Sequence, residues 1–211
     1  YDLETNGKSS KKLNNRGKSF GYQVLGFGSG VDAGSPLAQV TQKAIFAFGF
    51  ISAATAISNL VSSSGVIGSD VAGVGTARDN GAGAGYGTDK AIFGFGWSTA
   101  NTGMTNLVSN TGVVATDTSA VGTARHALSA TQYGSDKAIF LYGSSTQVNL
   151  VSSSGVVASD SSGTGTTRSY MAASPYGLDK AILAYGNLAP DGSGLTNLSN
   201  LISSSGVIAS D

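Results

Sequence analysis

The chain has 211 residues, of which 31 are Gly, one is His and none is Cys, and only 11% are charged. The absence of Cys excludes disulfides, thiolate metal sites and thiol nucleophiles. A single His excludes a histidine-clustered metal site within one chain, so we expect neither a metal nor another cofactor. The hydrophobic fraction of 40% and the zero formal net charge are unlike a charge-driven disordered sequence.

The first 20 residues form a basic arm, with five cations against two acids. The cations are Lys8, Lys11, Lys12, Arg16 and Lys18. Such an arm is either a solvated terminus or an electrostatic attachment to an acidic partner. We assign 1–36 to this arm and a divergent lead-in, and 37–211 to one domain. No apolar stretch approaches the ~18 residues that span a bilayer, so membrane insertion is not expected.

The domain consists of four sequence repeats. The segment Lys-Ala-Ile-Phe begins at Lys43, Lys90 and Lys137, and returns as Lys-Ala-Ile-Leu at Lys180. A second segment recurs as NLVSSSGVIGSD, NLVSNTGVVATD, NLVSSSGVVASD and NLISSSGVIASD. A third recurs as GTAR, GTAR and GTTR. Self-similarity at a period of about 40–50 residues is typical of β-propellers and related repeat folds.

The spacing of these segments separates a scaffold from variable loops. The step from Asp to Arg is always 8 residues and the step from Arg to Lys is always 12, whereas the step from Lys to the next Asn is 16, 16, 12 and 20. Constant spacing indicates packed structure and variable spacing indicates surface loops. The predicted loops cover residues 48–58, 95–105, 142–148 and 185–199.

Each repeat is predicted to form short β-strands. Residues 91–95 are apolar on both faces and bounded by Gly, as in a strand buried on two sides. Residues 106–108 and 113–115 are expected to pair about a tight turn in which Gly112 has positive φ. A fourth strand is expected between Arg125 and Tyr133, with a short helix over 127–130 as the alternative.

The repeat resembles a kelch blade, and more closely the kelch-like repeat proteins of tailed bacteriophages, especially cyanophages and marine phages. The matching stretches are DKAIFGFG at 89–96, TNLVSNTGVVATD at 105–117 and VGTAR at 121–125. The sequence departs from the kelch pattern because Gly94 and Gly96 are not adjacent and the Trp expected after the hairpin is absent. The resemblance implies an all-β, kelch-like propeller of about four blades; the alternative is a stacked or trimeric β fibre segment. It also implies a tail-fibre or appendage protein of the virion.

The candidate chemical sites are a histidine, the recurring Asp and Arg residues, the glycine-rich stretches and the carboxylates. His126 could act as a general base, but sister repeats place Asp79 and Ser169 there, which favours an incidental surface residue. The recurring Asp and Arg residues favour scaffold contacts over ligand binding. The glycine-rich stretches lack the context of a phosphate loop, so nucleic acid and nucleotides are not expected as ligands. The only Glu is Glu4, which leaves little support for paired-carboxylate hydrolysis.

Aromatic side chains at the mouths of the variable loops are the candidate contacts for a glycan or protein partner. They are Trp97, Phe50, Tyr142 and Tyr185. Aromatic rings stack on sugars, although Phe95, Tyr142 and Tyr185 could equally fill the space between blades. We therefore predict a non-enzymatic virion protein without catalytic residues, which binds other virion proteins, host-surface glycan and further copies of itself. The alternatives are a glycan-degrading appendage domain and a secreted bacterial adhesin.

Overall fold

The computed structural model describes residues 43–188 and 194–211, and these residues form strands and loops without a helix. The absence of a helix settles the choice at 127–130, where the chain instead leads into the strand β6 (Ser129–Tyr133). The basic arm and the lead-in, with Lys8, Lys11, Lys12, Arg16 and Lys18, lie outside the described residues.

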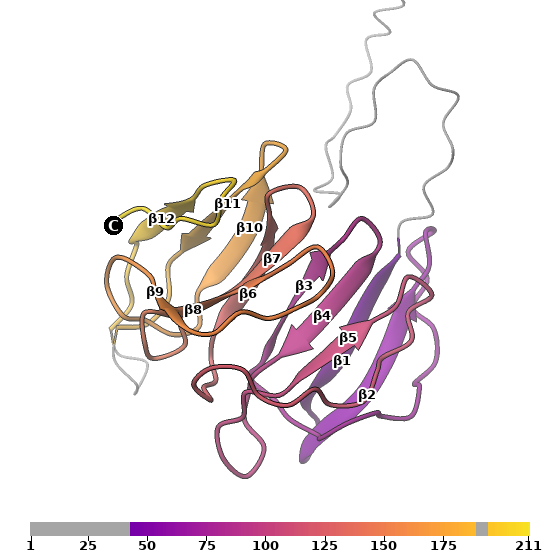
Figure 1. Ribbon diagram of the computed structural model, residues 1–211. Coiled ribbons are helices and arrows are strands. Elements are labelled where there is room, and N and C mark those ends of the chain that lie inside the picture. The colour runs from indigo at the N-terminus through magenta and orange to yellow at the C-terminus, as the bar shows by residue number, and fades with distance from the viewer. Residues whose placement is uncertain (1–42, 189–193) are drawn as a thin grey trace, which may run out of the picture.

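The strands form four small antiparallel sheets, one for each repeat (Figure 1). The first sheet contains β1 (Ala44–Phe50) and β2 (Ala54–Val61). The second contains β3 (Ala82–Tyr86), β4 (Lys90–Gly94) and β5 (Thr105–Val108). The third contains β6, β7 (Lys137–Leu141), β8 (Gln147–Val151) and β9 (Ser161–Ser162). The fourth contains β10 (Ala172–Tyr176), β11 (Lys180–Ala184) and β12 (Ser199–Ile202).

The Lys-Ala-Ile strand is the middle strand of each three-stranded unit. In the second sheet, Tyr86 pairs with Lys90 across the tight turn between β3 and β4, and Ala91 pairs with Val108 of β5. The predicted hairpin after β5 forms with Gly112 at φ 84°, but its second half is only a bridge between Val108 and Val114. In the second sheet, the four predicted strands are therefore present only in part, as three regular strands and one short return segment.

The second, third and fourth sheets pack on one another in chain order, mainly through their first strands, whereas the first sheet meets the second through side chains such as Phe48, whose ring lies 5.7 Å from that of Phe93. β3 contacts β6, and β6 contacts β10, while the middle strands β7 and β11 join the same contacts. Two apolar cores fill the spaces between sheets. One includes Ile92 and Phe140, and the other includes Ile139 and Leu183. The described strands run from β1–β2 on one side to β10–β12 on the other and form no closed propeller (Figure 1).

Candidate ligand-binding site

Each of the last three repeats is closed by an Arg near its start and an Asn and an Asp near its end. In the third repeat, Arg125 Nη2 donates to Asn149 Oδ1 at 2.6 Å, and Arg125 Nε donates to the carbonyl of Tyr142 at 2.7 Å. Arg125 Nη1 lies 3.8 Å from Asp160 Oδ1. Asp160 also accepts from the backbone N–H and the hydroxyl of Thr123, at 2.8 and 2.7 Å.

The same Arg–Asn–Asp cluster is built in the neighbouring repeats. It consists of Arg78, Asn106 and Asp117 in the second repeat, and of Arg168, Asn200 and Asp211 in the fourth. The three arginines and three asparagines are buried. The scaffold interpretation of the recurring Arg and Asp is thereby confirmed. The pairing is not the one at eight residues, because each Arg reaches the Asp at the far end of its own repeat.

Burial and hydrogen bonding shape the ionisation of these clusters. Burial lowers the pKa of Arg78 and Arg125 to about 10, against the raising effect of Asp117 and Asp160. Both guanidinium groups are therefore charged at neutral pH. The hydroxyl of Thr166, with further donors from Arg168 and Asn200, lowers the pKa of Asp211 to about 2.

Each cluster covers an aromatic ring of the preceding repeat. Arg78 lies 3.8 Å from the ring centre of Phe48, and Arg125 lies 4.1 Å from that of Phe95. Arg168 lies 5.8 Å from the ring centre of Tyr142, whose hydroxyl donates to the carbonyl of Thr164. Tyr142 is fully buried. The prediction that Tyr142 contacts a glycan is therefore wrong, because its ring is part of the packing between repeats.

The backbone after these rings makes a sharp turn that projects the next side chain outward. Phe48, Phe95, Tyr142 and Tyr185 have φ between 58° and 64°, and each is followed by a Gly that also has positive φ. At Gly96 the turn also requires a residue without a side chain, because a Cβ there would lie 2.5 Å from the carbonyl oxygen of Asp79. The residues projected by the four turns are Phe50, Trp97, Ser144 and Asn187.

The residues that directly follow the three arginines, Asp79, His126 and Ser169, lie beside the projected residues. Trp97 exchanges two backbone hydrogen bonds with Asp79, at 2.8 and 2.9 Å, and Asn187 does the same with Ser169. Contacts between repeats complete the row, since the hydroxyls of Ser144 and Ser169 lie 3.1 Å apart. We call Phe50, Asp79, Trp97, His126, Ser144, Ser169 and Asn187 the loop-end row. It carries four different side chains at one structural position of the repeat.

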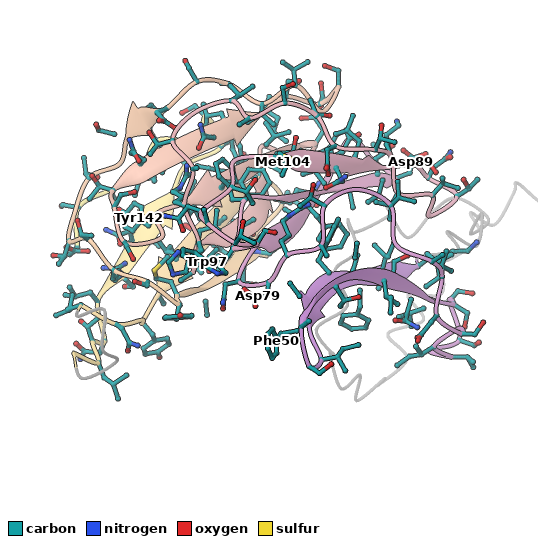
Figure 2. All side chains as sticks on the ribbon, turned by 90° about the horizontal axis from the view of Figure 1, so that it is seen from below. Phe50, Asp79, Asp89, Trp97, Met104 and Tyr142 are labelled. Atoms are coloured by element: carbon teal, nitrogen blue, oxygen red, sulfur yellow. The ribbon has the colours of Figure 1, made fainter. Side chains whose placement is uncertain are left out.

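Trp97 is the centre of the row's most developed site. Its ring meets that of His126 edge to face at 5.5 Å between centroids, and His126 Nδ1 lies 2.6 Å from Asn101 Oδ1. Trp97 is 41% exposed, and Asn101 is exposed as well. Figure 2 shows Asp79 between Trp97 and Phe50, which lies at the end of β1. His126, which the sequence favoured as incidental, is therefore a member of this site.

The other predicted aromatics lie apart from the Trp97 site. Phe50 is 67% exposed, and Tyr185, 62% exposed, occupies the position equivalent to the buried Tyr142. The Trp97 site itself offers one aromatic face, an amide, an imidazole and one carboxylate. Such groups bind neutral hydroxylated ligands through stacking and hydrogen bonds.

The described residues hold no group of three or more His, Cys, Asp or Glu that could bind a metal ion. In that same part of the chain, no helix has the length and apolarity to cross a membrane. No protein-family model and no curated protein matches this sequence.

Proposed function

We propose that this chain is a non-enzymatic display module of a tailed-phage virion, in a tail fibre or appendage, which binds host-surface glycan through the loop-end row. The virion assignment rests on the resemblance of the repeats to phage proteins. The binding assignment rests on the Trp97 site. In this proposal the four sheets are successive kelch-like blades, and the basic arm attaches the module to other virion proteins.

One observation carries the binding proposal: the residue after the positive-φ Gly differs in every repeat, although the backbone turn that holds it is the same. The turn recurs in all four repeats and the Arg–Asn–Asp cluster in the last three, whereas the residue after the Gly is Phe, Trp, Ser or Asn. A scaffold that needed a particular residue there would repeat it. A surface that meets a ligand benefits from different side chains on rigid supports.

The chemistry of the Trp97 site favours a sugar. Trp97 and His126 hold each other edge to face, so the exposed Trp ring is fixed before a ligand arrives. Preorganisation reduces the entropy lost on binding. Asn101 and Asp79 supply polar groups beside the ring, in the arrangement of a stacking face with hydrogen-bonding neighbours.

A two-part experiment with polysaccharide extracted from the host surface tests this function. We expect the purified chain to be retained on immobilised polysaccharide and displaced by the soluble polymer. We expect no reducing sugar to be released on prolonged incubation. Absence of retention contradicts the binding role, while sustained release of reducing sugar contradicts the non-enzymatic role and favours a glycan-degrading domain.

A further inference from the structure

The contact between consecutive repeats is a recurring one with two distinct sides. The turn Gly of one repeat presses on a Tyr or Leu of the preceding repeat. A Cβ on Gly155 would lie 2.9 Å from the ring of Tyr86, and a Cβ on Gly206 would lie 2.9 Å from Leu150 and 3.0 Å from Tyr133. We call the turn the donor side of the contact, and the Tyr and Leu surface the acceptor side.

Backbone hydrogen bonds add to each contact between repeats. The N–H of Gly87 donates to the carbonyl of Asp136, and the N–H of Gly134 donates to that of Asp179, both at 2.7 Å. The Arg over the aromatic ring of the preceding repeat belongs to the same contact. Tyr86 and Tyr133 are consequently buried.

The fourth repeat presents an acceptor side that no described residue covers. Tyr176 is the counterpart of Tyr86 and Tyr133 and is 40% exposed, while Leu201, the counterpart of Leu150, is 52% exposed. Tyr185, the counterpart of the buried Tyr142, is exposed too. A Cβ on Gly177, the counterpart of Gly87 and Gly134, would meet nothing within 4 Å among these residues.

The first repeat presents the matching donor side. Gly65 is the counterpart of Gly112, Gly155 and Gly206, and has φ +80° like them, but a Cβ on it would meet nothing within 4 Å in the described part of the chain. The Asn59 and Asp70 side chains are already bonded at 2.8 Å, as Asn149 and Asp160 are in the third repeat. The turn is therefore prebuilt in the conformation that packs on a Tyr and Leu surface elsewhere.

We infer that a second copy of this chain docks head to tail, with the Gly65 turn of one copy on the Tyr176 and Leu201 surface of the next. The interface continues the contact already made three times within the chain, so it needs no new geometry. It is heterologous, because different surfaces of the two copies meet, and it therefore either closes into a ring or extends. The interface does not use Trp97, Asn101 or His126, so it can be tested separately from glycan binding at the Trp97 site.

Two blocking variants of the whole chain test this inference. Gly65→Asn puts a side chain where the contact leaves no room for one, and Asn tolerates positive φ better than most residues. Leu201→Glu puts a charge on the acceptor surface. Val113→Glu is the control. The valine at this position is similarly exposed in all four repeats (Val66, Val113, Val156 and Val207), so the contact between repeats does not bury it. Thermal unfolding of each variant establishes that it is folded.

Sedimentation velocity over a series of concentrations gives the outcome. We expect the unaltered chain and Val113→Glu to associate, and each blocking variant to raise the apparent dissociation constant by about tenfold or more. Mixing the two blocking variants should restore a dimer and nothing larger, because one acceptor side and one donor side remain intact. The inference is overturned if the unaltered chain stays monomeric, as it would if residues 1–42 covered the end sheets. It is also overturned if the blocking variants associate normally, or if the mixture stays monomeric.

Discussion

Arg125 and Asn149 meet in the interior of the third repeat, with Nη2 of the arginine 2.6 Å from Oδ1 of the asparagine. Arg125 comes just before β6 and Asn149 lies in β8, so their bond ties the segment that enters the sheet to its third strand. Because both side chains are buried, removing one leaves polar groups of the other without a partner.

Arg125→Met is expected to lower the free energy of unfolding by about 2–4 kcal/mol, because it leaves Asn149 and the Tyr142 carbonyl unpaired. Urea unfolding monitored by circular dichroism measures this. The control is Lys137→Met, which removes an exposed ion pair with Asp136 and should change stability by less than about 1 kcal/mol. An unchanged stability of Arg125→Met, with loss of glycan binding, would contradict the scaffold role and make Arg125 a ligand contact.

The recurring Arg shows how far the sequence predicts this molecule. The repeated pattern correctly located the Lys-Ala-Ile strands and assigned Arg and Asp to the scaffold, because packed segments cannot change length. The predicted loop 48–58 is wrong, since β1 continues to Phe50 and β2 begins at Ala54. The spacing did not show which Asp each Arg contacts, since Arg78 and Asp117 meet only when the sheet brings the repeat's two ends together.

Tyr142 and Tyr185 show a second limit of the sequence. Each follows the Lys-Ala-Ile strand, precedes a Gly and has positive φ, yet Tyr142 is buried and Tyr185 is exposed. The difference comes from the following repeat, whose Arg168 covers Tyr142. His126 contacts Trp97 for a similar reason. Its neighbour Arg125 packs over Phe95 of the preceding repeat, and His126 therefore lies beside Trp97 of that repeat.

Tyr142→Ala is expected to cost about 3–5 kcal/mol of unfolding free energy, because it removes a buried ring from the packing between repeats. Tyr185→Ala, at the equivalent position, should cost less than about 1 kcal/mol in dilute solution, because its ring is exposed. Urea unfolding of the pair measures the difference. Equal costs would show that the two rings have the same surroundings in solution.

Gly122→Ala is expected to destabilise the fold by about 2–4 kcal/mol. Gly122 has φ +90°, and a Cβ there would lie 2.7 Å from Asn149 Nδ2 and closer still to the Asp160 carboxylate. Gly65→Ala is the matched control, since it has a similar φ without neighbours among the described residues and should cost only about 1 kcal/mol. Thermal unfolding compares them, and equal effects would mean that backbone strain alone accounts for Gly122.

Acid is expected to weaken the fold through Asp211. Its pKa falls from 3.8 to about 2 on folding, chiefly because Thr166 donates to the carboxylate. The folded state binds the proton less tightly than the unfolded state. The resulting stabilisation is therefore fully present well above pH 4 and is lost as the pH falls towards 2.

Burial raises the pKa of Asp117 and Asp160, but the hydrogen bonds from the Thr and Asn of each cluster, together with the charge of its Arg, outweigh burial and lower both values. These carboxylates therefore add to the acid sensitivity. Urea unfolding from pH 6 to pH 2 measures the loss. Thr166→Val should flatten the curve, while Thr166→Ser, which keeps the hydroxyl, should not. A Thr166→Val curve parallel to that of the unaltered chain would contradict this assignment.

The central claim is that a sugar stacks on the ring of Trp97. Calorimetric titration of Trp97→Ala with an oligosaccharide from the host-surface polymer tests this claim most directly. Val113→Ala is the control, because Val113 is also exposed but lies in the hairpin after β5, at the opposite end of the strands. We predict that Trp97→Ala binds about five- to thirtyfold more weakly, because stacking on an aromatic face contributes about 1–2 kcal/mol, while Val113→Ala and the unaltered chain bind alike. Equal affinity of Trp97→Ala and the unaltered chain would contradict the claim.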